Sequence, residues 1–424
     1  MTEISHIAQM PGRARDARII GLVSGAHFIS HLYMLVLPPV FAFIKADYAV
    51  SYAELGFAIA TFNVVSAAFQ TPAGFLVDRF GAPRLLIAGL ALSAFSAALA
   101  GLLPSYGGLI AAFALLGLAN TIYHPADYAI LSHTIDHRGL GKAFSLHTFF
   151  GTLGTAVAPT LMLFLTGIWG WRGAFVGAAA FGFAMAMVLL FNRGTLEDAM
   201  AAHPRHVPSP VPGSARPKSA VGWRLLLSPP ILRNVAFFVV LSIASGGMQA
   251  FSIVALVALY RTPLAVANFA LSGYLLLNAL GVLAGGIVAS RAKRHELVAA
   301  VGFIASGALI LVVGLVDLGS ALLVLMMAGS GFLNGIILPS RDMIVRAATP
   351  PGSFGKVFGF VSTGFNISGI IAPLLFGWLM DQAHPRSIFL VIAGFTLLSL
   401  PLMTGGSGRR KERVSAVADG LKLP

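Results

Sequence analysis

Titratable side chains recur inside stretches of the chain that are otherwise apolar. His27 and His31 are four residues apart, which places them on one face of a predicted helix. His124 and Asp127 lie in a second apolar stretch, and His147 lies in a third. Because an ionisable side chain within a long apolar segment is costly, it is usually kept for function. These residues therefore predict a site that binds a substrate or carries a proton.

Arg341 is the cationic candidate, and it shares its apolar stretch with Asp342 and Arg346. Asp127 and Arg341 are 214 positions apart, which is the spacing of an internal repeat. A buried charge needs a partner, so Arg341 and Asp127 can pair across a cavity. Asp342 can instead pair with Arg341 locally, or with Arg346 four residues further along a helix. A third possibility is that Arg341 binds an anionic substrate.

Three roles are open for the histidines. They can be hydrogen-bonded between packed helices, or they can carry a coupling proton, because histidine titrates near neutrality. They can also hold a divalent metal, for which His27, His31 and His124 supply suitable ligands together with Asp127. Arg341 at a similar depth would repel a metal cation, so the sequence favours no resident metal. No cofactor is expected.

The composition defines the setting of these residues. Hydrophobic residues make up 57% of the chain and charged residues only 10%, whereas soluble proteins carry about 25% charged residues. Apolar runs of roughly 18 or more residues recur, each long enough to cross about 30 Å of hydrocarbon. The runs are continuously apolar and not alternating, which favours helices over a barrel. The chain has no cysteine, so a disulfide or thiolate metal site is excluded.

Charged breaks divide the apolar runs into twelve predicted membrane helices, an even number that places both termini on one side. The predicted helices lie at 19–44, 53–77, 85–103, 108–134, 143–167, 172–192, 232–259, 268–290, 297–316, 320–347, 356–380 and 387–404.

Lys and Arg gather on one side of these helices. By the positive-inside rule that side, with both termini, faces the cytoplasm. We expect a multi-pass protein of a bacterial-type plasma (inner) membrane, whose formal charge of +13 reflects its topology. The basic residues are scattered over short loops, so no nucleic-acid partner is expected. They concentrate around 1–18, 78–84, 135–142, 193–231, 291–296 and 405–424, and the opposite loops hold only Lys45, Arg172, Arg261 and Arg386.

The chain divides into an N-terminal six-helix bundle over 1–192 and a C-terminal six-helix bundle over 232–404. A proline-rich cytoplasmic linker over 193–231 is predicted to be extended or disordered, and a basic cytoplasmic tail follows at 405–424. The two bundles are repeats, because an Asn, a Lys, an Arg and two Pro of the first bundle, all scarce residue types here, recur 214 positions later together with matched Gly, Ala and Phe. The matched residues of the first bundle are Gly117, Asn120, Pro125, Gly141, Lys142, Phe144, Ala158, Pro159, Arg172 and Phe175. Their counterparts in the second bundle, in the same order, are Gly331, Asn334, Pro339, Gly355, Lys356, Phe358, Ala372, Pro373, Arg386 and Phe389.

A charged connection, Gly74-Phe-Leu-Val-Asp78-Arg79-Phe-Gly81-Ala-Pro-Arg84, lies between two apolar runs, and its degenerate copy has Ser290 in place of the aspartate. The first copy resembles the gating loop between helices 2 and 3 of the major facilitator superfamily of secondary transporters. The resemblance implies an all-α membrane protein with twelve transmembrane helices in two pseudo-symmetric six-helix halves, the major facilitator fold. It implies a monomer whose helices 1, 4, 7 and 10 line a central cavity.

The same resemblance gives the loop a function. It implies that Asp78 pairs with Arg79 and Arg84 and with a helix end of the other half, which keeps the cytoplasmic side shut in the outward-open state. Gly74 and Gly81 suit close packing there. A solvated turn with inside-positive charges is the alternative.

A narrower resemblance rests on two segments, His27-Phe-Ile-Ser-His31-Leu-Tyr-Met-Leu-Val-Leu-Pro38-Pro39 and Tyr123-His124-Pro125-Ala-Asp127-Tyr128. They look like the fosmidomycin-resistance branch of the superfamily, which implies proton-driven efflux of small antibiotics, including a phosphonate. Arg341 and titratable histidines suit such an anion. Further polar candidates for the cavity, each equally suited to helix packing, are Tyr33, Tyr128, Gln249, Asn278, Asn334 and Asn366.

The expected function is secondary active transport by alternating access, most simply proton-coupled efflux of a small anionic or drug-like molecule. The partners are then a small-molecule substrate, protons and the lipid bilayer. Import of a metal ion, a metal chelate or an organic anion is the alternative within transport, and a non-transporting membrane receptor or sensor is the alternative outside it. An enzyme is disfavoured, because neither a nucleophile–base arrangement nor a soluble catalytic domain is evident. No ATP-binding motif is present, so an ion gradient is expected to be the energy source.

Overall fold

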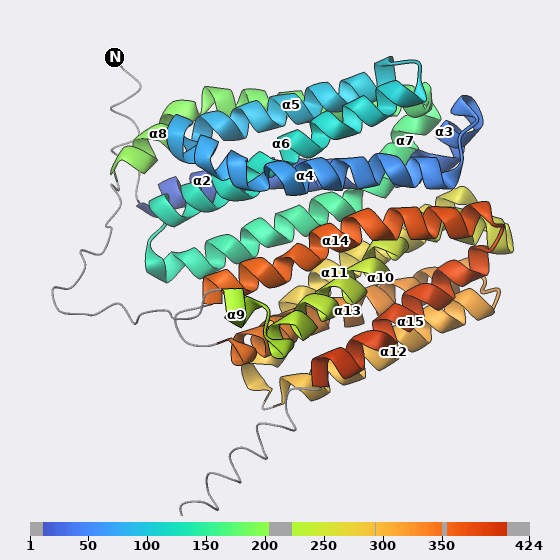
Figure 1. Cartoon of the computed structure of the whole chain (residues 1–424). Coiled ribbons are helices and arrows are strands. Elements are labelled where there is room, and N and C mark those ends of the chain that lie inside the picture. Colours follow the sequence, from blue (N-terminus) through green and yellow to red (C-terminus); the bar gives the residue numbers. More distant parts are fainter. Residues whose placement is uncertain (1–11, 203–222, 293, 350–353, 405–424) are drawn as a thin grey trace, which may run out of the picture.

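The structure, a computed structural model, describes residues 12–202, 223–292, 294–349 and 354–404, and every regular element in them is a helix (Figure 1). The first half comprises α2 (Gly12–Met34), η1 (Pro38–Val40), α3 (Phe41–Tyr48), α4 (Tyr52–Phe80), α5 (Ala82–Leu102), α6 (Tyr106–Thr134), α7 (His137–Phe191) and α8 (Arg193–Ala202). The second half comprises α9 (Trp223–Leu226), α10 (Pro229–Tyr260), α11 (Leu264–Arg291), α12 (His295–Leu315), α13 (Ser320–Ala348), α14 (Phe354–Asp381) and α15 (Pro385–Thr404).

Long apolar helices dominate the described chain, and eleven of them are long and apolar enough to cross a membrane. One of these, α7, is interrupted at Gly170, whose φ of 69° and ψ of 172° are open to glycine at little cost. The helix therefore contains two crossings. The described helices provide twelve crossings in total, which confirms the predicted all-α membrane fold.

The first predicted helix, 19–44, is divided in the structure. The helix α2 ends at Met34, and Pro38–Val40 form a 3-10 turn before α3 begins. Two successive prolines lack the N–H groups that an α-helix needs, so the helical ladder cannot continue through them. The other predicted helices overlap the observed ones along most of their length.

Equivalent contacts build the two halves. Gly117 of α6 packs on the backbone of α4, and Gly331 of α13 packs on the backbone of α11. The carbonyl of Gly117 accepts a hydrogen bond from Ser66 at 2.8 Å, and that of Gly331 accepts one from Asn278 at 3.3 Å. A side chain at either glycine would meet the neighbouring backbone, so small residues set these helix distances.

The halves meet at one end of the bundle. We call the end where α2 begins and α15 ends the terminal face, and the opposite end the far face (Figure 1). At the far face the rings of Phe41 and Phe251, from different halves, lie 5.4 Å apart. Asp381 at the end of α14 accepts hydrogen bonds from the amides of Tyr52 and Ala53, which begin α4.

The terminal end of the second half has an apolar core of its own. That core includes Ile231, Phe237 and Phe303, and among the described residues it contains none from the first half. The described parts of the two halves thus join at the far face and separate toward the terminal face. If the termini are cytoplasmic, as the charge pattern predicts, this arrangement is inward-facing.

The segment after the sixth crossing begins as a helix. Residues predicted to be extended, 193–202, form α8, because Leu196 and Ala199 are buried where α8 contacts the ends of α5 and α6. Residues 203–222 of the predicted linker, and the predicted tail at 405–424, lie outside the described chain.

Candidate functional site: a histidine–aspartate cluster

Three helices of the first half bring five predicted site residues together. His27 and His31 come from α2, His124 and Asp127 from α6, and His147 from α7. The rings of His27 and His147 stack at 3.8 Å between centroids with an interplanar angle of 22°. The ring of His27 also lies 4.4 Å from that of His31 and 5.4 Å from that of His124. We refer to these five residues as the histidine–aspartate cluster.

Asp127 lies at the base of the cluster and has no exposed surface. Its Oδ2 atom is 3.4 Å from Nδ1 of His27 and 3.6 Å from Nε2 of His147. Both distances exceed those of a normal N–H···O hydrogen bond, and neither carboxylate oxygen has a hydrogen-bond partner. A buried carboxylate without hydrogen bonds is rare in a native protein, so the position of Asp127 calls for an explanation.

Glycines on α7 create the close approach that stacks the two imidazoles. A side chain at Gly151 would meet the ring of His27, and one at Gly154 would meet the backbone of Phe28 in α2. Gly151 follows His147 by four residues, so both lie on the face of α7 that α2 contacts. The stacking of His27 on His147 therefore depends on a missing side chain at position 151.

A proline shapes α6 beside the cluster. Pro125 has no N–H group, so the carbonyl of Thr121 loses its helical partner. The side-chain amide of Gln70 in α4 donates to that carbonyl at 3.2 Å. The break in the ladder of α6 is thus satisfied by a neighbouring helix of the same half.

The cluster runs from an exposed end to a buried end. His27 and His147 are almost fully buried, His31 is partly buried, and His124 is exposed. Tyr128 is 47% exposed, and its ring stacks on that of His124 at 5.8 Å. The cluster therefore extends from the exposed imidazole of His124 to the fully buried carboxylate of Asp127.

Thr155 orients one of the histidines and was not singled out from the sequence. Its hydroxyl donates to the carbonyl of Gly151 at 3.4 Å, and its oxygen lies within hydrogen-bond distance of Nδ1 of His31, at 3.2 Å. The spacing of eight residues from His147 to Thr155, which repeats the helical face, is the signal that could have found it.

Arg341 lies apart from the cluster. It is partly buried, and its guanidinium lies 4.7 Å from the ring centre of Phe238 and 5.8 Å from that of Phe365. The contacts of Asp127 in the described structure are with His27 and His147, so the predicted Asp127–Arg341 pair does not form in this arrangement. The side chains of Asp342 and Arg346 lie outside the described part of the chain.

Three of the six other polar candidates make hydrogen bonds between helices. Tyr33 is buried and donates to the carbonyl of Ala178, Asn278 donates to Gly331, and Asn334 donates to Tyr274 at 2.7 Å. Gln249 donates to Ser245 within its own helix, and Asn366 is partly buried.

The predicted gating loop has a partner that the sequence did not reveal. Arg84 donates to Glu197 of α8 at 2.8 Å, and Arg193 donates to the same carboxylate oxygen at 2.9 Å. These two hydrogen bonds lower the pKa of Glu197. Gly81 has a φ of 90°, which allows the turn from α4 into α5. The side chain at Gly74 would meet open space in this arrangement.

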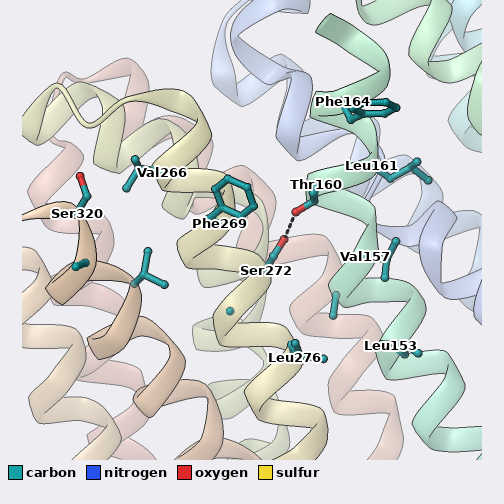
Figure 2. Close-up of a pocket in the computed structure, with 14 residues that line it drawn as sticks. Leu153, Val157, Thr160, Leu161, Phe164, Val266, Phe269, Ser272, Leu276 and Ser320 are labelled. Atoms are coloured by element: carbon teal, nitrogen blue, oxygen red, sulfur yellow. Dashed lines mark hydrogen bonds between the residues drawn. The ribbon is translucent and has the colours of Figure 1, made fainter. Parts of the chain in front are cut away.

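A hollow of about 1010 Å³ lies in the seam where α7 meets α11 and the start of α13, and none of the predicted site residues lines it (Figure 2). Its lining is mostly apolar, with Leu153, Phe164 and Phe269 among the residues. Thr160 and Ser272 form a 2.9 Å hydrogen bond across it, from one half to the other (Figure 2). The hollow is therefore a feature of the seam and not of the titratable cluster.

Twelve apolar crossings, two equivalent halves and a buried titratable cluster in one of them define a membrane transport protein. A family comparison gives the same answer: the model of the Major Facilitator Superfamily matches residues 23–266 and 260–420. The chain belongs to this superfamily. It is accordingly a secondary transporter and not an enzyme.

Individual relatives are distant. The chain is 23% identical over 411 residues to a probable sulfoacetate transporter, SauU, of Cupriavidus necator, an alignment covering 89% of this chain and 90% of that protein. It is 22% identical over 143 residues to the fosmidomycin resistance protein of Escherichia coli, covering 34% of this chain and 35% of that protein.

One solved structure shows the shared fold. A bacterial homologue of the human lysosomal transporter Spinster, in an inward-facing and occupied conformation, superposes with a TM-score of 0.73 at 14% identity. The match covers 93% of this chain and 97% of that one.

Proposed function

We propose that this protein transports a small organic anion across the bacterial inner membrane and couples the movement to protons. In this proposal the histidine–aspartate cluster of the first half carries the proton, and Arg341 of the second half binds the anion. The observation that carries it is Asp127, a fully buried carboxylate that lies beside two stacked imidazoles without a hydrogen bond.

Charge counting supports a single proton. An ionised Asp127 beside neutral His27 and His147 leaves one negative charge buried without compensation. One added proton, shared within the cluster, neutralises it. A second proton would leave a net positive charge buried in the cluster, either on one imidazolium beside a protonated Asp127 or on two imidazolium rings that repel in a stack at 3.8 Å. The three groups therefore titrate as one unit with an optimum of one bound proton.

Arg341 supports the anionic substrate. Its guanidinium lies over the rings of Phe238 and Phe365, and the planar, multiply donating guanidinium group suits a carboxylate, sulfonate or phosphonate. The relative aligned over most of its length is described as a sulfoacetate transporter, and sulfoacetate carries two such groups. Fosmidomycin, named in the shorter match, carries a phosphonate. We therefore favour small sulfonates, phosphonates and carboxylates over neutral drugs.

Efflux remains our expectation for the direction, from the resemblance of the helix 1 and helix 4 segments. In efflux, protons move inward through the cluster while the anion moves outward.

A metal substrate is the second candidate, because donor atoms of His27, Asp127 and His147 lie within 4.8 Å of one another. This is a different set from the predicted His27, His31 and His124. An imidazole binds a metal in the plane of its ring. The His27 and His147 planes are only 22° apart in a stack, so their lone pairs do not converge on one point. A metal would require one ring to rotate, whereas a proton would not.

The test uses the purified protein, first in a thermal-shift screen and then in liposomes. We expect stabilisation by sulfoacetate or a related anion, and uptake of that anion that follows an imposed pH gradient and acidifies or alkalinises the lumen. Transport whose rate does not depend on the pH gradient would rule out proton coupling. Stabilisation by divalent metals and not by anions would indicate a metal substrate in place of an anion. The orientation of the pH gradient that drives uptake shows whether the substrate moves with the protons or against them.

A further inference from the structure

The antiparallel helices α4 and α14 come from different halves and pack along each other. Each carries an acidic residue in its last turn, Asp78 in α4 and Asp381 in α14, and these lie at opposite faces of the bundle. An acidic side chain is unfavourable at the C-terminal end of its own helix, where the macrodipole is negative. It becomes favourable when the N-terminus of another helix lies beside it.

Asp381 lies beside such an N-terminus, that of α4. Its Oδ1 accepts from the amide of Tyr52 at 2.8 Å, and its Oδ2 accepts from the amide of Ala53 at 2.8 Å. The next amide of α4, that of Glu54, donates to the side chain of Ser51 at 3.1 Å. The first three amides of α4 lack partners within the helix, so two of them depend on a residue of the other half.

Backbone contact reinforces this junction. A side chain at Gly377 of α14 would meet the backbone of Tyr52 and Ala53, and one at Gly56 of α4 would meet the backbone of Pro373. Lys45 adds a weak ion pair, with its Nζ 4.0 Å from Asp381. The second seam, between α7 and α11, is bridged in the described chain by the neutral Thr160–Ser272 hydrogen bond beside the hollow.

We propose that Asp381 is a latch of the far face: its carboxylate holds the start of α4 while the far face is shut, and alternating access requires that it let go. The proposal depends on the transporter fold and on these contacts, and not on the substrate or the coupling ion. Removing the latch shifts the protein from the arrangement seen here toward one that is open at the far face. The acid of the gating loop, Asp78, belongs to the opposite face.

The chain contains no cysteine, so distances can be measured with a single engineered pair. Gly107→Cys at the start of α6 and Gly319→Cys before α13 lie toward the far face, one in each half, and an added side chain at either glycine meets no atom within 4 Å. Spin labels there report the opening of the far face by pulsed electron resonance. We expect Asp381→Asn to raise the ratio of long to short distances about tenfold, because a charge-assisted bond is replaced by a weaker neutral one.

Two matched controls accompany that variant. Asp47→Asn changes another carboxylate, one that pairs with Arg172 inside the first half, and should leave the distances unchanged. Tyr52→Pro removes one amide donor, and proline suits the first helical position after the extended Ser51. Tyr52→Ala removes the same ring but keeps the amide. Opening in Tyr52→Pro but not in Tyr52→Ala supports the latch, and unchanged distances in both Asp381→Asn and Tyr52→Pro overturn it.

Discussion

Asp127 and Arg341 occupy equivalent positions of the internal repeat, yet their surroundings share almost nothing. Asp127 is fully buried among imidazoles, whereas Arg341 is partly exposed over phenylalanine rings. The neighbouring helices differ as well. Phe365 lies beside Arg341, and the equivalent position of the first half is Gly151, where the absence of a side chain lets His27 approach. The two halves therefore differ at this position of the repeat. The first presents the histidine–aspartate cluster, which we call the titratable wall, and the second presents Arg341 over phenylalanine rings, which we call the cationic wall. We infer that the halves divide proton handling and anion binding between them.

The strongest test of this division is Asp127→Asn. The amide cannot exchange a proton, so we expect transport driven by a pH gradient to fall by about a hundredfold, while exchange of substrate across the membrane continues. Flux and counterflow in liposomes measure the two activities separately. Asp317→Asn, which changes an exposed carboxylate before α13, serves as the control and should leave both unchanged. Driven transport at the normal rate in Asp127→Asn would show that the first half does not carry the proton.

Arg341→Gln tests the other wall. Loss of the guanidinium removes charge-assisted hydrogen bonds to the substrate, so we expect the KM for the anion to rise about tenfold or more, with the coupling to protons retained. Arg341→Lys keeps the charge but loses the planar group that stacks on Phe238, so its KM should lie between the two. Arg291→Gln, at the exposed end of α11, is the matched change outside the cavity. An unchanged KM in Arg341→Gln would contradict anion binding at this position.

Gly151→Ala asks whether the titratable wall depends on close packing. The added methyl would meet the ring of His27, so we expect a loss of about 1–3 kcal/mol in stability and weaker coupling. Gly141→Ala changes the same helix where the new methyl meets no atom within 4 Å. Thermal unfolding in detergent and gradient-driven flux measure both effects. Equal behaviour of the two variants would mean that the stack of His27 on His147 is not needed.

The smallest effect is expected where the halves do use equivalent residues alike. Asn120 of α6 donates to Ser66, and its repeat partner Asn334 of α13 donates to Tyr274. Because hydrogen bonds between membrane helices contribute about 0.6 kcal/mol on average, Asn→Ala at either position should lower stability by that amount and leave transport nearly unchanged. A large transport defect in only one of them would extend the functional asymmetry into the scaffold.

The sequence predicted the fold well because each crossing is a long apolar run, a signal that no neighbouring segment can override. It also identified the cluster, because histidine and aspartate are conspicuous in apolar stretches. Side-chain direction was harder to predict. The repeat correctly placed Asp127 and Arg341 at equivalent positions but could not show that each turns toward its own half.

The residues that sequence reasoning missed have ordinary types and distant partners. Phe238 and Phe365 are two of 31 phenylalanines, and nothing in their spacing marks them as neighbours of Arg341. Glu197 was missed as the partner of Arg84 because its segment was expected to be extended. Asp381 is distant from α4 in the sequence and contacts it through backbone amides, which every residue except proline has, so no residue type marks the contact.

The junction at Asp381 also allows the opening of the far face to be followed in the unmodified protein. A helix whose first amides are satisfied by another half frays when that half moves away, and its freed N–H groups exchange with water. The amides of Tyr52 and Ala53 should therefore be protected from deuterium while the far face is shut and lose that protection each time it opens. Hydrogen exchange at the first turn of α4, in an unlabelled and unmutated chain, then reads out how a bound substrate divides the population between the two states.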